Sequence, residues 1–290
     1  MIPPAFDYHA PATLDEALAL LGEHGDEAKV LSGGQSLLPL LKMRFAAPEH
    51  VVDISRIPGL DYLKEEGGFL RIGALVRESE LEASDLIAKR YPILKDTAEV
   101  VADPLVRNLA TVAGNLAHGD PANDHPATMI ALGAEVVARG PKGERTIAVA
   151  KFFEGVLTTA LGDDEILTEI RVPEPAERSG GAYIKLERKV GDYATAGAAC
   201  VVALRADGTV SSARIALTNL ATTPVNAEAA AQHLVGKKPK ADVLAKAGEL
   251  ASEATSPSAD RRGSVEYKKE MARVLTVRAL RKALERAGGK

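Results

Sequence analysis

Two short loops of small residues are the segments of this sequence whose residue types best suit cofactor chemistry. Residues 32–36 read Ser-Gly-Gly-Gln-Ser, and residues 111–115 read Thr-Val-Ala-Gly-Asn. Several backbone N–H groups can converge on a diphosphate only where no bulky side chain holds the ligand away. We therefore expect both loops to bind the diphosphate of one cofactor. Their candidate binding residues are Ser32, Gly33, Gly34, Gln35, Ser36, Thr111, Ala113, Gly114 and Asn115.

The first loop follows a short strand expected over residues 29–31 and precedes a short helix expected from Pro39 onward. This order, in which a strand is followed by a Gly-Gly loop and then by the start of a helix, favours binding of an anion. Neither G-x-G-x-x-G nor G-x-x-x-x-G-K-[ST] occurs, so a Rossmann NAD site and a P-loop are disfavoured. The alternative is a Gly-Gly turn that serves only to reverse the chain.

An acidic run, residues 120–124, follows the second loop. Asp124 is expected to accept hydrogen bonds from ribityl or ribose hydroxyls, as carboxylates do at nucleotide sites. The alternative is a plain helix N-cap. Asp120 and Asn123 are expected to shape the turn. His118 and His125 are either proton carriers or satisfied structural histidines.

Composition narrows the function classes. The 290 residues favour two domains, and a net charge of −4 without a dense basic patch makes nucleic acid an unexpected partner. Cys200 is the only cysteine, so the chain can form no internal disulfide and cannot ligate an iron–sulfur cluster alone. The six histidines show no zinc-type spacing, and no metal ligand is predicted. Redox chemistry here would need an organic cofactor.

The sequence also gives an expectation for location. The N-terminus lacks a basic start with an apolar core, and no apolar run approaches the ~20 residues that span a bilayer. A cytoplasmic protein without a transmembrane segment is expected, with a position at the inner membrane face only through partners.

Hydrophobic periodicity and turn residues predict two lobes and a further domain. The first lobe covers about 1–57, the second 58–176, and the C-terminal domain 177–290, after a Pro- and Gly-rich linker. Helices are expected over 14–21, ending at Gly25, and over 40–43, 78–89, 93–102, 122–132 and 264–286. Strands are expected over 29–31, 51–54, 69–72, 135–138, 165–172, 182–188, 196–205 and 209–219, with strand and loop over 108–119.

The loops carry a family resemblance. The chain resembles the FAD-binding medium subunits of molybdenum hydroxylases, of the carbon monoxide dehydrogenase and xanthine dehydrogenase type. Their Gly-Gly-x-Ser and T-[IV]-G-G-[NDS] loops hold the FAD diphosphate. Two departures occur: Gln35 stands where many members have His, and Ala113 replaces a Gly. Because alanine disfavours φ > 0, we expect the second loop to lie slightly farther from the phosphate, without loss of binding.

Further motifs extend the resemblance over nearly the whole chain. Residues 103–108 resemble D-P-x-V-R-N, residues 118–122 resemble H-x-D-P-A, and residues 161–167 resemble L-G-x-x-E-I-L. The resemblance implies additional FAD contacts at Val101, Asp124, Leu161, Lys185 and Tyr193.

Three of these residues suit the flavin ring. The backbone of Leu161 could satisfy a polar ring edge, and the charge of Lys185 would stabilise the reduced flavin. Tyr193 could cover a ring face and gate acceptor access. The alternatives are a solvated strand residue for Lys185 and a packing aromatic for Tyr193.

The resemblance implies an α+β fold: a two-lobed α/β FAD-binding domain (PCMH type) followed by a CO dehydrogenase flavoprotein C-terminal type domain, with a small antiparallel sheet and helices. It implies an oxidoreductase subunit with noncovalent FAD and no catalytic acid–base pair. Electrons would come from [2Fe-2S] clusters on a small subunit, and a large subunit would carry the molybdopterin cofactor, in a dimer of heterotrimers. The FAD would then pass these electrons to an external acceptor such as quinone.

Alternative functions remain open at this point. The motifs lie nearest to carbon monoxide dehydrogenase, but an aldehyde, purine or N-heterocycle dehydrogenase would use the same subunit. A stand-alone flavin oxidoreductase is a rival enzyme. A flavin-free scaffold is a rival of another class, mildly favoured by Ala113.

Overall fold

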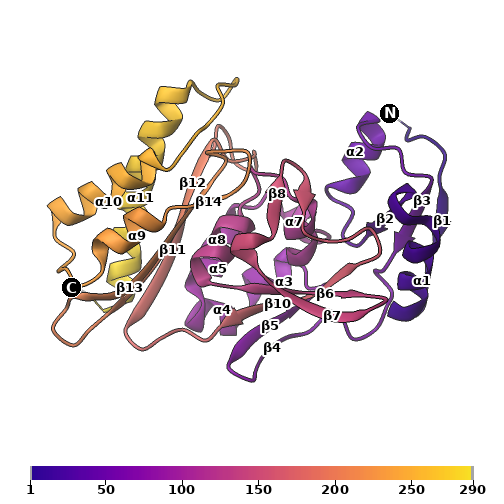
Figure 1. The fold of residues 1–290 in the computed structure, drawn as a ribbon, viewed down its shortest axis with the longest axis horizontal. Helices are drawn as coiled ribbons and strands as arrows, with labels where there is room; N and C mark the ends of the chain where they lie inside the picture. Colours follow the sequence, from indigo (N-terminus) through magenta and orange to yellow (C-terminus); the bar gives the residue numbers. More distant parts are fainter. Residues whose placement is uncertain (1, 289–290) are drawn as a thin grey trace.

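The computed structural model describes residues 2–288, and its three larger sheets follow one another along the long axis of the molecule (Figure 1). The sheets have three, five and four strands. Helices pack against each sheet, so the chain combines helix and sheet throughout. Within the described residues, no helix has the length and apolar character that crossing a bilayer requires.

The N-terminal lobe is a parallel three-stranded sheet in the order β1-β3-β2. Its elements are β1 (Asp7–His9), α1 (Leu14–His24), β2 (Ala28–Leu31), α2 (Leu37–Met43) and β3 (His50–Asp53). Thr13 caps α1 by accepting from the Glu16 N–H, and Gly25 ends the helix with φ 54°. The helices and strands expected in this lobe are confirmed, although α2 begins before Pro39.

The middle of the chain forms an antiparallel sheet in the order β4-β5-β10-β6-β7. Its strands are β4 (Leu63–Glu66), β5 (Phe69–Gly73), β6 (Glu135–Gly140), β7 (Gly143–Ala148) and β10 (Ile166–Pro173). A two-stranded ribbon, β8 (Phe153–Gly155) and β9 (Thr158–Thr159), lies between β7 and β10 in the sequence. Six helices accompany them: α3 (Glu78–Ala83), α4 (Asp85–Arg90), α5 (Pro92–Val100), α6 (Pro104–Arg107), α7 (Val112–His118) and α8 (His125–Leu132).

Two sequence predictions are wrong in this region. The single helix expected over 78–89 is two helices, because Ser84 has an extended backbone (ψ 121°) and its hydroxyl caps α4 by accepting from Ile87 N. The strand and loop expected over 108–119 contain a helix, α7, capped by Thr111 and ended by Gly119 with φ 68°. The Gly and Ala content of residues 108–119 predicted an irregular segment, but the caps at Thr111 and Gly119 stabilise a helix between them.

The C-terminal sheet lies between two layers of helices (Figure 1). Its strands are β11 (Ser179–Leu186), β12 (Ala196–Leu204), β13 (Val210–Thr218) and β14 (Val225–Asn226). One face packs on α5 and α8, and the other carries α9 (Glu228–Leu234), α10 (Ala241–Glu253) and α11 (Val265–Arg286). Tyr183 and Ala199 join the core of the preceding region, whereas Ala182 and Cys200, one position away, join the C-terminal core. This alternation follows the two-residue period of a strand.

Candidate cofactor site

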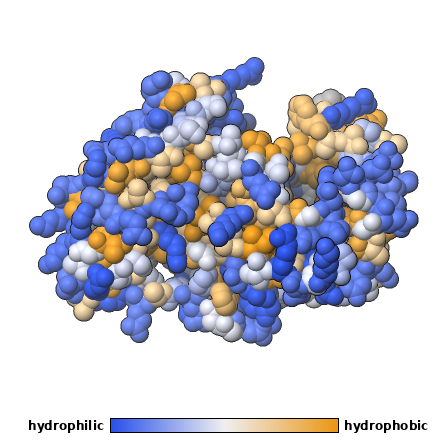
Figure 2. Space-filling view, viewed as in Figure 1, coloured by the Kyte–Doolittle hydropathy of each residue, from blue (hydrophilic) through white to orange (hydrophobic). Residues whose placement is uncertain are grey.

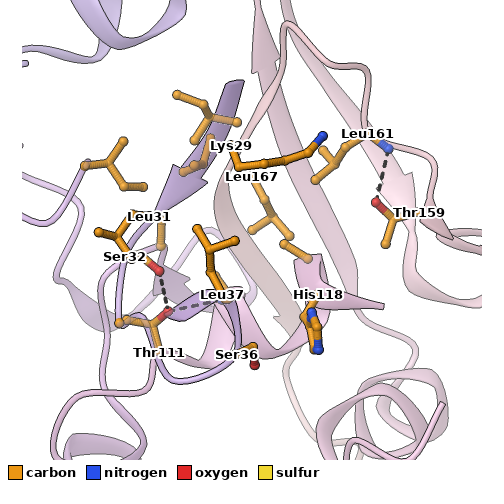
Figure 3. Close-up of a pocket in the computed structure, with 18 of the residues that line it drawn as sticks. Lys29, Leu31, Ser32, Ser36, Leu37, Thr111, His118, Thr159, Leu161 and Leu167 are labelled. Carbon is orange, nitrogen blue, oxygen red and sulfur yellow. Dashed lines mark hydrogen bonds between the residues drawn. The ribbon is translucent and has the colours of Figure 1, made fainter. Parts of the chain in front are cut away.

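A cavity of about 470 Å³ separates the N-terminal lobe from the five-stranded sheet region. Its wall includes the end of β2 with the following loop, the start of α7, and the segment from β9 into β10. The predicted residues that line it are Ser32, Gly33, Gly34, Gln35, Ser36, Thr111, Ala113, Gly114, Asn115 and Leu161. Figure 3 shows Ser32 and Thr111 turned toward one another on one side of the cavity, and Thr159 with Leu161 on another.

The first loop fits closely against the chain segment that precedes the second. A Cβ atom added at Gly33 would lie 2.8 Å from Ala110 Cα and would also collide with the carbonyl oxygen of Leu109. Gly34 has φ 74°, a conformation that favours glycine. Among residues 2–288, the backbone N–H groups from Gly33 to Ser36 donate to no other group of the chain. Glycine is therefore needed here for the approach of two backbones, and the loop leaves donors free for a ligand.

The second loop is a helix cap. Thr111 Oγ1 accepts from the Gly114 N–H at 3.1 Å and lies 3.0 Å from Ser32 Oγ, which ties the two loops together. A Cβ at Gly114 would lie 2.6 Å from Thr111 Oγ1 and would break this cap. The reason given for the effect of Ala113 does not hold, because Ala113 lies within α7, is 3% exposed and does not have positive φ. The distance of this loop from the phosphate stays a prediction.

Asn115 provides the test of whether these residues fit a polar cofactor. Its Oδ1 is buried and has no hydrogen-bond partner within the described chain. Its own backbone oxygen accepts from Asn123 Nδ2 at 2.8 Å. Because a buried acceptor without a partner costs free energy, a ligand donor in the cavity would stabilise this side chain. The free N–H groups and the free acceptor fit the phosphate and hydroxyl groups of FAD.

The wall near the ribbon contributes His118 and Leu161. His118 is half-buried, and burial lowers its pKa below 6.5, an effect that the carboxylate of Asp120 opposes. The Leu161 N–H is 3.5 Å from Thr159 Oγ1, so its hydrogen bond is weak and can be exchanged for a ligand. Asp120 accepts from the Ala122 N–H at 2.8 Å, so its expected role in shaping the turn is confirmed.

The remaining predicted residues, Val101, Asp124, Lys185 and Tyr193, lie outside the lining of this cavity. Asp124 occupies the N-cap position of α8, but its side chain makes no capping bond. Its carboxylate accepts instead from Tyr183 Oη at 2.6 Å and Lys185 Nζ at 2.9 Å. Burial raises the pKa of Asp124, and the charge of Lys185 opposes that rise. The solvated-strand alternative for Lys185 is wrong, since its side chain is 2% exposed.

Val101 and Tyr193 belong to two loops that touch. A Cβ at Gly191, in the Tyr193 loop, would lie 3.0 Å from the carbonyl oxygen of Ala102. Tyr193 is 47% exposed, and burial and the Asp120 and Asp124 carboxylates raise its pKa. Lys185 also contacts the segment that contains Val101, because its Nζ donates to Val100 O at 2.8 Å. The four residues thus form a second group where the C-terminal sheet meets α5 and α8.

Arg107 is a residue that the sequence reasoning did not single out. Its guanidinium donates to Val101 O at 3.0 Å and to Glu82 Oε2 at 2.7 Å, and it is 9% exposed. Arg107 therefore fixes the position of the Val101 backbone relative to Glu82 of α3. The D-P-x-V-R-N motif contained this signal. His125 is fully buried, and its Nε2 lies 2.7 Å from the Glu78 carboxylate. Its Nδ1 has no hydrogen-bond partner among the described residues, so the alternative of a satisfied structural histidine is supported for one ring nitrogen only.

Comparisons with known proteins agree with this geometry. The FAD binding domain in molybdopterin dehydrogenase matches residues 4–175, and the CO dehydrogenase flavoprotein C-terminal domain matches residues 181–283. The carbon monoxide dehydrogenase medium chain of Hydrogenophaga pseudoflava is 47% identical over 287 residues, covering 99% of both chains. That of Afipia carboxidovorans is 45% identical with the same coverage.

A solved structure extends the similarity to three dimensions. A chain of carbon monoxide dehydrogenase from Hydrogenophaga pseudoflava superposes with a TM-score of 0.96 at 49% identity, covering 99% of both chains. The fold class expected from the motifs is confirmed. The chain belongs to the family of FAD-binding medium subunits of the molybdenum hydroxylases, as its two loops indicated.

Proposed function

We propose that this chain carries FAD as the electron-transfer subunit of a molybdenum hydroxylase that oxidises carbon monoxide. The observation that carries the proposal is the shared cavity of the two loops. Among residues 2–288, the backbone N–H groups from Gly33 to Ser36 in the first loop and Asn115 Oδ1 in the second have no hydrogen-bond partner. The identity of 47% to a carbon monoxide dehydrogenase medium chain, over almost its full length, favours this substrate.

Each group of residues has a distinct task in this proposal. The loops at Ser32–Ser36 and Thr111–Asn115 would hold the diphosphate, and Asn115 would accept from a hydroxyl. Val101, Asp124, Leu161, Lys185 and Tyr193 would surround the ring and its ribityl chain. Bound FAD supplies the exchange of one and two electrons, which the chain lacks. The buried Lys185 would place a positive charge near the ring, while the exposed Tyr193 would control access.

The metal centres would belong to partner chains. Cys200 is buried, and burial raises the pKa of its thiol far above the ordinary range, so it is an unsuitable cluster ligand. A small subunit with two [2Fe-2S] clusters and a large molybdenum subunit would complete the enzyme as a dimer of heterotrimers. Figure 2 shows apolar surface over the part of the N-terminal lobe near α2, where Met43 is 46% and Phe45 78% exposed. Such surface supports docking of a partner.

The first test is cofactor binding by the full-length chain. We expect one FAD per chain, and complete release of the flavin into the supernatant when acid denatures the protein. The reason for release is that neither loop contains a His or Cys that could form a covalent link. Flavin that stays with the precipitate contradicts noncovalent binding, and a folded chain that binds no FAD contradicts the flavoprotein assignment.

The second test uses the complex purified with its partner chains. Carbon monoxide should drive reduction of a quinone analogue, whereas xanthine and aldehydes should not. Oxidation of an aldehyde or purine in place of carbon monoxide would refute the substrate assignment. Turnover of a small organic substrate by the isolated chain would instead show a stand-alone flavin oxidoreductase.

A further inference from the structure

Three histidines meet in the N-terminal lobe, and none of them lines the cofactor cavity. His9 ends β1, His24 ends α1 and His50 begins β3. Nε2 of His9 and Nδ1 of His50 are 3.1 Å apart, and the rings of His24 and His50 stack with centroids 3.6 Å apart. One ring nitrogen from each histidine lies within 4.8 Å of the other two.

The fold fixes this arrangement through three separate elements. In the parallel pairing of β1 with β3, Asp7 lies opposite His50 and His9 lies opposite Val52. Residues two apart on a strand share a face, so His9 and His50 project from the same side of the sheet. The helix α1 packs against β2 and β3, and its last residue brings His24 to the other two.

The distances suit a transition-metal ion. Zinc binds imidazole nitrogen at about 2.0–2.1 Å, and a tetrahedral site then separates two ligand nitrogens by roughly 3.3 Å. The His9–His50 separation is close to that value. The rings of His24 and His50 are stacked at 3.6 Å, so the His24 side chain would have to change rotamer and turn edge-on to the ion to complete the set. Imidazole suits zinc, copper and nickel, whereas magnesium and calcium prefer oxygen ligands.

Carboxylates lie next to the cluster. Glu27 and Glu49 each place an oxygen within 4.8 Å of one ring nitrogen of His50 and of one another. Their backbones are joined, because Glu49 N donates to Glu27 O at 3.0 Å. They provide negative charge near the ion and a candidate for the fourth ligand position, which a water molecule could also fill.

We propose that His9, His24 and His50 form a binding site for one Zn²⁺-type ion in the N-terminal lobe. The ion would fasten the end of α1 to β1 and β3, beside the strand that leads into the loop at Ser32. The role is structural, so the ion would stabilise the lobe without taking part in electron transfer. The sequence did not predict this site, because its ligands come from three elements with no local spacing.

The test uses the full-length chain without a polyhistidine tag, stripped with EDTA and titrated with zinc chloride by calorimetry. We expect one zinc per chain, and a rise in Tm of roughly 5 °C when free zinc exceeds its Kd about 100-fold. Cobalt(II) in place of zinc should give visible absorption of a tetrahedral complex. His24→Ala should abolish binding, and the matched control His233→Ala, in α9, should bind zinc as the wild type does.

FAD content serves as the check that variants are folded, since the cluster lies outside the cofactor cavity. If His24→Ala does not fold, His9→Gln replaces it, with the same loss of binding expected. No zinc binding at about 100 µM zinc, or equal binding by wild type and a folded cluster variant, would overturn the proposal. A Tm that depends on pH but does not change on addition of zinc would show a histidine cluster that binds no metal, and would equally overturn the proposal.

Discussion

Lys185 Nζ lies 2.9 Å from Asp124 Oδ2, although one residue is on β11 of the C-terminal sheet and the other stands at the start of α8. Tyr183 donates to the other oxygen of the same carboxylate at 2.6 Å. Both side chains of the ion pair are nearly fully buried. This network joins the C-terminal sheet to the helices of the middle region, directly beside Val100 and Val101.

Asp124→Asn should destabilise the chain by about 3 kcal/mol, because it removes the nearer of two carboxylates beside the buried ammonium of Lys185 and leaves only Glu187, whose Oε2 is 3.4 Å away. The free energy of unfolding from urea denaturation measures this. Adding Lys185→Met to Asp124→Asn should recover part of the loss. The control is Glu249→Gln, which breaks an exposed pair with Lys246 and should change stability little. If Asp124→Asn costs no more than this control, the pair has no stabilising role.

The sequence predicted those elements whose signals are local. The helix at Leu14–His24 followed from the Thr13 cap and apolar spacing, and the hairpin between β12 and β13 followed from Asp207-Gly208. The helix α7 was missed because small residues outweighed the Thr111 and Gly119 caps. Loop residues could be predicted from composition. The contacts of Lys185, Arg107 and the three histidines could not, because they join distant segments that meet only after folding.

Gly33→Ala should reduce FAD content to less than half and lower Tm. The added Cβ would collide with Leu109 O and Ala110 Cα, so the loop must move away from the second loop and the free N–H groups with it. Flavin absorbance per chain and thermal unfolding measure the two effects.

The matched control for that substitution is Gly22→Ala in α1. Nothing lies within 4 Å of a Cβ at Gly22, and alanine favours a helix by about 0.5–1 kcal/mol. This variant should keep its FAD and unfold at a slightly higher temperature. Normal flavin content in Gly33→Ala would mean that the close approach of the loops is unnecessary for binding.

The stability of the chain should fall at acidic pH partly through His118. Burial lowers the pKa of its imidazole below 6.5, so the folded state favours the neutral ring. That contribution is fully present above pH 6.5 and is lost as the pH falls through the lower pKa of the folded state. His118→Gln should therefore lose less stability between pH 7.5 and 5.5 than the wild type does.

The difference should not exceed about 1.4 kcal/mol per pH unit, the limit for one proton. Unfolding free energies at the two pH values measure it, with His233→Gln as the control variant. Equal losses in the wild type and His118→Gln would show that this histidine is not responsible.

Tyr193→Ala should change the reoxidation of the flavin rather than its retention. Tyr193 lies on the β11–β12 connection and is 47% exposed, whereas the proposed diphosphate contacts lie on the loops at Ser32 and Thr111. Removing the aromatic ring would open one side of the flavin to acceptors without touching those loops. We expect nearly full FAD occupancy and an altered rate of reoxidation by quinone or dioxygen in the assembled complex.

Val190→Ala, at a 91% exposed position of the same connection, is the control and should leave both quantities unchanged. A collapse of FAD occupancy in Tyr193→Ala, or wild-type values of both quantities, would refute the gating role.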